Sequence, residues 1–320
     1  MLRNFKKFVS FVLVFVLSVT ASLPAFAEGS SKSKSSNLVT KSELSSSTNP
    51  LDSGKEILYY LFWTQDTKLK SDLANLQKSL KLSSEQMTEL KAIALKQFQA
   101  NKELPNRSSN SIINTKSYNT SIEESADNTN QAIKSVLKDS YSKFRNWIAS
   151  WWQGESDYRT NLLLENRENS LLPNANISTH TIYATQYDPT TAGAKEVSLP
   201  DKYLKFANLG WDDTYPNPPY TVSIRSSAGS ISNVRVDDVG PWNENDNYWD
   251  STRRTWNGRL SLGTPEAYAA FKNNFNNGED EFGRKVTNPA GIDLSPAAAK
   301  AIGLGTNESG WIVVTYSKLP

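Results

Sequence analysis

The pattern of apolar residues changes near Ile177, and this change constrains the fold more than any other feature of the sequence. Before it, apolar residues recur every three or four positions, as on one face of a helix. One such series is Leu69, Leu73, Leu76 and Leu80. After it, short β-prone runs are separated by clusters of Gly, Pro, Asn and Asp. The sequence therefore predicts an α+β multidomain protein with an N-terminal helical bundle and a mainly β second domain.

The helical domain is predicted over residues 54–165. Ser83 begins a capping box in which Gln86 is the third helical residue, so a helix is expected to start there. A loop is expected over 101–118, followed by one helix that includes 133–152. That helix carries Trp147, Trp151 and Trp152. A tryptophan cluster can serve a membrane surface or a partner protein, but at helical spacing it is more often core, and we expect core packing.

The β domain is predicted over residues 178–320. Its expected strands are 180–187, 220–225, 232–236 and 310–316. Two short helices are also expected. The first covers 265–275 with Thr264 as its N-cap, and the second covers 296–302 with Ser295 as its N-cap.

The first 27 residues are typical of a secretory signal. Three basic residues precede the apolar run 8–17, and Ala25-Phe26-Ala27 has the small-x-small pattern that places cleavage before Glu28. The apolar run is too short to span a membrane, so no stable span is expected after cleavage. Residues 28–53 and 166–177 are predicted linkers. We expect a secreted protein that is associated with the cell wall, and an exported chain without cysteine is typical of a Gram-positive bacterium.

Composition excludes several classes of function. The chain has 320 residues with a formal charge of +2, which becomes −1 when the three charges of the signal are lost, so binding of nucleic acid through bulk charge is not expected. The absence of cysteine excludes disulfides, thiolate metal sites and cysteine nucleophiles. The single histidine, His180, excludes a multi-histidine metal site. The oxygens of 245–247 suit Ca²⁺, but the spacing of an EF-hand is missing. We expect no metal and no cofactor.

Two stretches carry the functional argument. In the first, a β run ends in Asp238-Val239-Gly240-Pro241. In the second, Asp293-Leu294-Ser295 leads into an Ala-rich helix, then Gly303-Leu304 and a closing strand. These motifs, in this order, resemble the rare lipoprotein A family, whose relatives include the expansins. The resemblance covers roughly 178–318.

The resemblance implies a six-stranded double-psi β-barrel and a ligand that is peptidoglycan or another wall polysaccharide. Some members of the family are lytic transglycosylases, whereas expansins loosen walls without measurable hydrolysis. Because the two motifs lie far apart in this chain, residues 243–288 are expected to form an inserted helical subdomain.

Asp293 is the predicted catalytic acid/base and Asp238 its partner, because breaking a glycosidic bond requires an acid for the leaving oxygen. We expect the two residues to end neighbouring strands and to face one groove. Each also has a structural alternative. Asp293 suits the N-cap of the following helix, and Asp238 suits a turn in which it accepts backbone N–H groups.

Aromatic and polar side chains next to these aspartates are predicted to bind substrate, because flat rings stack on the apolar faces of sugars. They are Trp242, Tyr248, Trp249, Asp237 and Tyr187. The alternative for the three rings of 242–249 is a small core of the insertion.

The sequence thus predicts a protein that binds, and in one hypothesis remodels, peptidoglycan or a related polysaccharide through the barrel groove by lytic transglycosylase chemistry. The residues leave two alternatives open: a non-catalytic expansin-like polysaccharide-binding module, and a secreted protease inhibitor.

Overall fold

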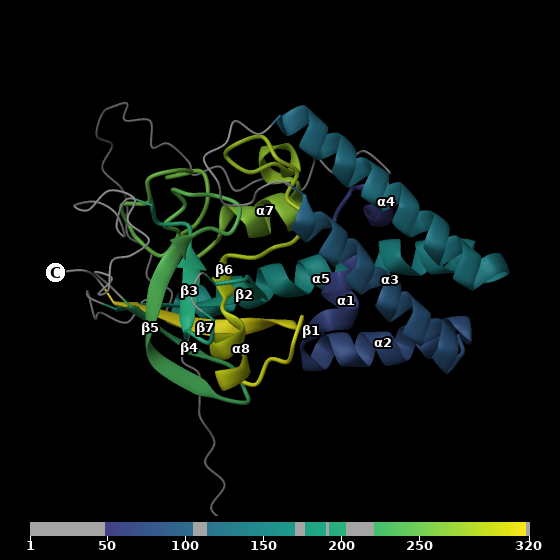
Figure 1. Ribbon diagram of the computed structural model, residues 1–320, viewed down its shortest axis with the longest axis horizontal. Helices are drawn as coiled ribbons and strands as arrows, with labels where there is room; N and C mark the ends of the chain where they lie inside the picture. Colours follow the sequence, from purple (N-terminus) through teal and green to yellow (C-terminus); the bar gives the residue numbers. More distant parts are fainter. Residues whose placement is uncertain (1–48, 105–113, 170–176, 190–191, 203–220, 318–320) are drawn as a thin grey trace, which may run out of the picture. The chain divides into compact units, whose positions relative to one another are not determined.

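The computed structural model describes residues 49–104, 114–169, 177–189, 192–202 and 221–317. A helical N-terminal region precedes a closed six-stranded β-barrel (Figure 1). The predicted signal and most of the first predicted linker lie outside the described residues.

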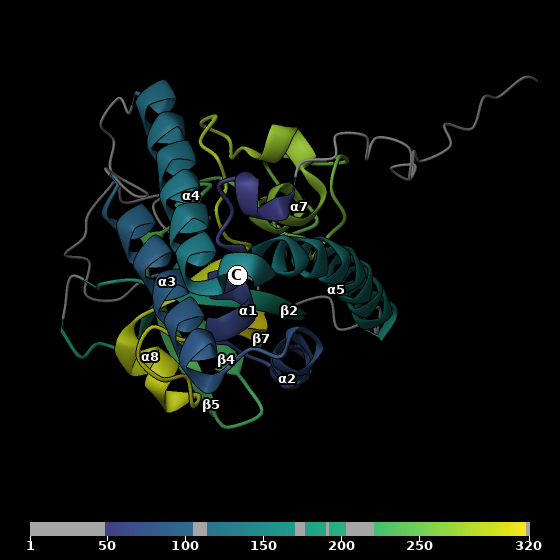
Figure 2. The ribbon, with the colours of Figure 1, turned by 90° about the vertical axis from the view of Figure 1, so that its right-hand side faces the viewer.

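The helical region contains η1 (Pro50–Asp52), α1 (Ile57–Trp63), α2 (Thr67–Leu80), α3 (Ser84–Glu103), α4 (Thr115–Leu137), η2 (Lys138–Ser140) and α5 (Tyr141–Asn169). The barrel strands are β2 (Ile177–Gln186), β3 (Glu196–Leu199), β4 (Thr221–Arg225), β5 (Ser230–Val239), β6 (Ile292–Leu294) and β7 (Ser309–Ser317). Between β5 and β6 lie α7 (Glu266–Asn273) and η3 (Phe275–Gly278), and α8 (Pro296–Ala301) joins β6 to β7. In Figure 2, α3 runs beside α4, against which it packs.

The barrel closes because its strands pair in the order β7-β2-β6-β3-β5-β4, and β4 pairs back with β7. The pairs β2–β6 and β3–β5 are parallel, and the other barrel pairs are antiparallel. This result confirms the predicted order of a helical region followed by a six-stranded barrel. Alternate side chains fill the interior, among them Val197, Leu199, Ile292 and Leu294. The residues between them point to the outer face.

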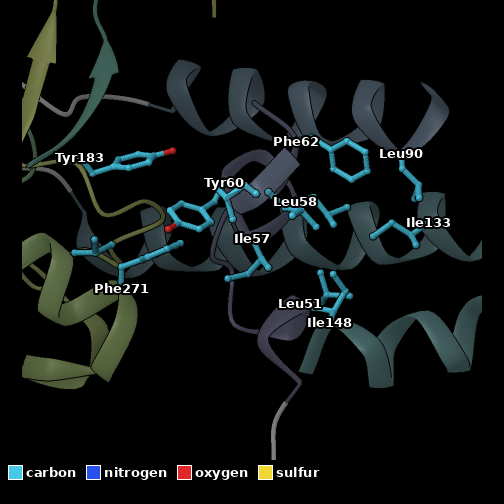
Figure 3. Packing of buried hydrophobic residues seen from close by; sticks show 14 of the residues in the cluster. Leu51, Ile57, Leu58, Tyr60, Phe62, Leu90, Ile133, Ile148, Tyr183 and Phe271 are labelled. Atoms are coloured by element: carbon cyan, nitrogen blue, oxygen red, sulfur yellow. The ribbon is translucent and has the colours of Figure 1, made fainter. Parts of the chain in front are cut away.

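A second core lies where the helical region meets the barrel (Figure 3). It combines Tyr60 of α1 with Tyr183 of β2 and Phe271 of α7, all of them buried. The Tyr60 and Tyr183 rings lie 5.4 Å apart, and the Tyr60 and Phe271 rings 6.0 Å apart. The segments predicted as separate helical and barrel domains therefore share one hydrophobic core.

A short strand strengthens this junction. In β1 (Thr64–Gln65), Thr64 pairs in parallel register with Ser309 of β7. The Thr64 hydroxyl also lies 2.8 Å from the Tyr183 hydroxyl and 3.2 Å from the Ser309 hydroxyl. The helical region thus extends the sheet of the barrel by one strand.

The predicted tryptophan cluster packs partly buried against the shared core. The indole N–H of Trp151 donates to Asp72 of α2 at 2.9 Å, and that of Trp147 donates to Asn75 at 3.3 Å. Core packing, the expected interpretation, is confirmed for the inner faces of these rings.

Two helix predictions were wrong. The single helix expected over 133–152 is broken at Lys138, whose φ of 48° is incompatible with a continuing α-helix. The loop expected over 101–118 is shorter, because α3 continues to Glu103 and α4 begins at Thr115. The break at Lys138 carries no Gly or Pro signal, whereas the end of α3 is marked by Pro105, two residues beyond Glu103.

Of the predicted helix caps, Ser83 and Ser295 are confirmed and Thr264 is not. The capping box is confirmed, because Ser83 and Gln86 exchange side-chain to backbone bonds of 3.0 and 3.1 Å. Ser295 caps α8 as predicted. Thr264 was the wrong N-cap for α7. Pro265 occupies that position, and the Glu266 N–H donates to Asp246 from a distant loop at 2.7 Å.

Candidate functional site

Four polar residues form a row across the outer face of the barrel. Asp293 of β6 pairs with Thr185 of β2 on one side and with Ser198 of β3 on the other. Ser198 in turn pairs with Asp238 of β5. Residues paired across adjacent strands point to the same face of a sheet. The predicted catalytic pair therefore shares one face.

The expectation that Asp238 and Asp293 end neighbouring strands was wrong, because β3 lies between β5 and β6. With strands about 4.8 Å apart, the backbones at the two aspartates are ~10 Å apart. Ser198, which is buried, occupies the position between them.

A β-bulge places a third carboxylate beside this row. The register between β3 and β5 shifts at Val197 and Ser198, so that Asp237 has no partner in β3. A bulge redirects the side chain of the extra residue. Asp237 accepts from the guanidinium Nε of Arg235 at 2.8 Å and forms an ion pair with it. The bulge explains why the pattern Val-Arg-Val-Asp-Asp-Val does not alternate strictly. Asp237 and Asp238 are both half-buried, and Val239 is buried again.

Glu196 and Tyr187 complete an acidic cluster with Asp237 and Asp238. Burial and the charge of Asp237 raise the pKa of the Glu196 carboxyl. Burial raises the pKa of Tyr187 further from neutrality, and the charges of Glu196 and Asp238 act in the same direction. A carboxyl with a raised pKa retains its proton to a higher pH, which is the property of a general acid. We call these four residues the acidic cluster.

Asp293 is held firmly in place. It is only 7% exposed, and the Thr185 hydroxyl donates to its Oδ1. The alternative role as N-cap of α8 belongs to Ser295, whose hydroxyl accepts from the Ala298 N–H at 3.2 Å. Asp293 is therefore not the N-cap of α8, and it contributes its carboxylate to the row.

A small pocket adjoins the acidic cluster, with Tyr187 in its wall. Its volume is about 100 Å³. The barrel contributes Gln186, Tyr187, Asp188, Pro296, Thr306 and Asn307, and the helical region contributes Tyr59, Phe98 and Lys102. Tyr59 is fixed by its hydroxyl, which donates to the Asn307 carbonyl at 2.5 Å, and its ring stacks on Phe98 at 3.9 Å.

The aromatic residues predicted to bind substrate lie in the interior instead. Trp242 is 1% exposed in the core shared with the helical region, and its indole N–H donates to Asn288 at 3.2 Å. Tyr248 is buried in the barrel core, and the Trp249 ring stacks on Tyr316 at 4.5 Å. These ring faces are covered by protein, but they belong to the two main cores rather than to a separate small core of the insertion. Of the predicted binding residues, Tyr187 and Asp237 lie beside Asp238.

Several residues of the site were not identified from the sequence. Glu196 lies in a four-residue strand, and although Asp188-Pro189 and Gly193 before it are a turn signal, no strand was predicted there. Lys102, Tyr59 and Phe98 belong to helices in which no catalytic pattern stands out, and only the tertiary fold brings them to the barrel. The oxygens of Asp246, considered for Ca²⁺, accept instead from Arg253 at 2.6 Å and from the Glu266 N–H at 2.7 Å.

Comparison with known proteins gives a match to a family model over the barrel segment. Residues 178–315 match a domain of unknown function, DUF8814. This segment begins in β2 and ends in β7, so it coincides with the barrel. No curated protein and no solved structure matches the chain. Across the residues that the structure describes, helices long and apolar enough for a membrane crossing are lacking.

Proposed function

We propose that the barrel is of the double-psi type and binds cell-wall glycan, peptidoglycan in particular, along the outer face that carries the row and the acidic cluster. The observation that carries this proposal is the register that sets Asp293 and Asp238 on one face with a single residue between them. Two motifs far apart in sequence gain a common surface only through this pairing. The fixed orientation of Asp293 by Thr185 adds support.

The chemistry proposed for this face is lytic transglycosylation. Protonated Asp293 donates its proton to the oxygen that links C1 of N-acetylmuramic acid to the next sugar, and the C1–O bond breaks. The 6-hydroxyl oxygen of the same muramic residue bonds to C1, and its proton returns to the Asp293 carboxylate. Water is not consumed. The Asp238 carboxylate stabilises the positive charge that develops at C1.

A second candidate is glycan binding without cleavage, as in expansins. Two observations favour it: Asp293 is 7% exposed, and the rings of Trp242 and Trp249 are buried rather than aligned beside it. In this case Asp237 and Asp238, the half-buried carboxylates of the row and the acidic cluster, provide hydrogen-bond acceptors for sugar hydroxyls.

The experiment uses protein expressed with its own signal in a Gram-positive host and recovered from the medium. Export with cleavage before Glu28, as proposed, gives a mature N-terminus at that residue. The protein is incubated with intact and with peptide-stripped peptidoglycan, and soluble products are identified by mass spectrometry. Asp293→Asn and Asp238→Asn are compared with Asp127→Asn, an exposed aspartate of α4.

Anhydromuramyl products are expected from the native protein. We expect a loss of at least ~100-fold in Asp293→Asn, the scale of general acid catalysis, a smaller loss in Asp238→Asn and none in Asp127→Asn. Co-sedimentation with the wall without products, weakened in Asp238→Asn, supports the non-catalytic candidate. Absence of both products and binding overturns the proposal.

A further inference from the structure

The pocket beside the acidic cluster contains one basic side chain, Lys102 of α3. No other lysine or arginine lines it within the described part of the chain. Because α3 belongs to the helical region, this charge comes from outside the barrel that carries the row. A barrel on its own would lack it.

Lys102 already binds a carboxylate. Its Nζ lies 2.8 Å from Asp188 Oδ2 at the rim of the pocket, where the lysine side chain is 34% exposed and that of the aspartate 85% exposed. Such an exposed pair contributes little to stability, since solvent screens it and both side chains lose rotamer freedom. The pair shows that the site accommodates a carboxylate. Because the pair is weak, breaking it costs little free energy when the carboxylate of a ligand takes the place of Asp188.

The size and lining of the pocket limit what enters it. About 100 Å³ is less than the ~150 Å³ of a cavity that holds benzene, so the pocket is too small for a sugar ring but has room for a short branch. The stacked Tyr59 and Phe98 rings provide an apolar wall, and Tyr187, a member of the acidic cluster, also lines the pocket. A group with a methyl and a carboxylate matches this combination of one cation and apolar contacts.

We propose that this pocket recognises, through Lys102, the free lactyl carboxylate of an N-acetylmuramic acid residue that carries no stem peptide, while the row contacts the glycan strand. The inference rests on the proposed function and specifies its substrate: muramic acid rather than a glycan of N-acetylglucosamine alone. The helical region then acts as a specificity element for the barrel, and Asp188 competes with the ligand for Lys102.

The test compares two tetrasaccharides of equal length by microscale thermophoresis, with mass spectrometry to verify that the ligand stays intact. One alternates N-acetylglucosamine with N-acetylmuramic acid, and the other is chitotetraose, which has no lactyl group. Lys102→Met retains the apolar stem and removes the charge. Lys96→Met, an exposed position of the same helix, is the matched control. Asp188→Asn releases Lys102 from its partner.

We expect the native protein and Lys96→Met to bind the muramyl tetrasaccharide about fivefold more tightly than chitotetraose, which corresponds to ~1 kcal/mol. Lys102→Met loses this preference, and Asp188→Asn increases it. Equal binding of the two ligands by the native protein, or a preference that survives in Lys102→Met, overturns the inference and leaves glycan binding standing. If neither tetrasaccharide binds, the proposed function fails together with the inference.

Discussion

Glu266 in α7 is a carboxyl group buried without a cation in hydrogen-bond contact. Its Oε2 accepts from Asn243 at 2.8 Å, and its Oε1 makes no hydrogen bond with any described residue. Burial raises the pKa of Glu266 from 4.5 to about 8. Between these two pH values the folded state retains a proton that the unfolded state has lost. The contribution of Glu266 to the free energy of unfolding is therefore fully present below pH 4.5, and it is lost as the pH rises through 8.

Glu266→Gln is expected to be close to the native protein in stability at pH 4.5 and more stable at pH 8.5. The difference should grow by at most ~1.4 kcal/mol per pH unit across the window, the free-energy equivalent of one unit of pKa. Urea unfolding at several pH values measures it. Glu89→Gln, on the exposed face of α3, is the control and should show no such trend. A difference that is independent of pH would contradict the assignment of Glu266 as the titrating group.

The serine N-caps of α3 and α8 differ in their burial and in the hydrogen bonds that they make outside their own helix. Ser83 caps α3 at the surface. Ser295 is buried, and besides capping α8 its hydroxyl accepts from the Glu196 N–H at 3.1 Å and donates to the Ala194 carbonyl at 2.6 Å. One side chain thus ties α8 to the start of β3, the strand that carries Glu196 and Ser198.

We expect Ser83→Ala to cost about 1 kcal/mol, the usual value of an N-cap. Ser295→Ala should cost ~3 kcal/mol or more, because it also leaves a backbone N–H and a carbonyl unpaired in the interior. Chemical denaturation of the two variants beside the native protein measures both losses. Equal losses would mean that the bonds from Ser295 to the start of β3 contribute nothing to the free energy of unfolding.

The two caps also show which features of the fold could be predicted from the sequence. Signals contained in a few neighbouring residues, such as the capping box at Ser83 and the cap at Ser295, were predictable because the partners are local. The order of the strands was not, and so Asp238 and Asp293 were placed on adjacent strands although β3 lies between them. The bulge at Asp237 arises from the same pairing. It had no local signal, because Asp-Asp within a β run is equally compatible with a regular strand.

For the whole molecule, the helical region and the barrel are joined through a common core at Tyr60, Tyr183 and Phe271 (Figure 3). Apolar periodicity predicts that a helix face is buried, but not which other face covers it. The sequence therefore indicated two separate domains, whereas in the structure one of the two cores is built from both segments. The same limit applies to the aromatic residues that were predicted to bind a sugar. Their residue types suit a sugar ring, but tertiary packing, which the local sequence does not show, buries them in the two cores.

We expect the two regions to unfold together. Phe271→Ala removes a fully buried ring at the junction and should cost about 3–5 kcal/mol. Hydrogen exchange in urea, followed by mass spectrometry of peptides from α1–α5 and from the barrel, should show the same loss of protection in both. Phe282→Ala, 46% exposed, should change little. Loss of protection confined to one region would indicate two independent units.

The pairing of β1 with β7 has a consequence for the order in which the chain acquires its structure. Thr64 and Ser309 are 245 positions apart. At a ribosomal rate of about 5–20 residues per second, β1 is synthesised roughly 10–50 s before its partner strand. During that interval the edge of β1 has no β7 to pair with, and Tyr183 of the shared core is itself made only about halfway through. The helical region therefore gains its full set of contacts only after the last strand of the barrel is made.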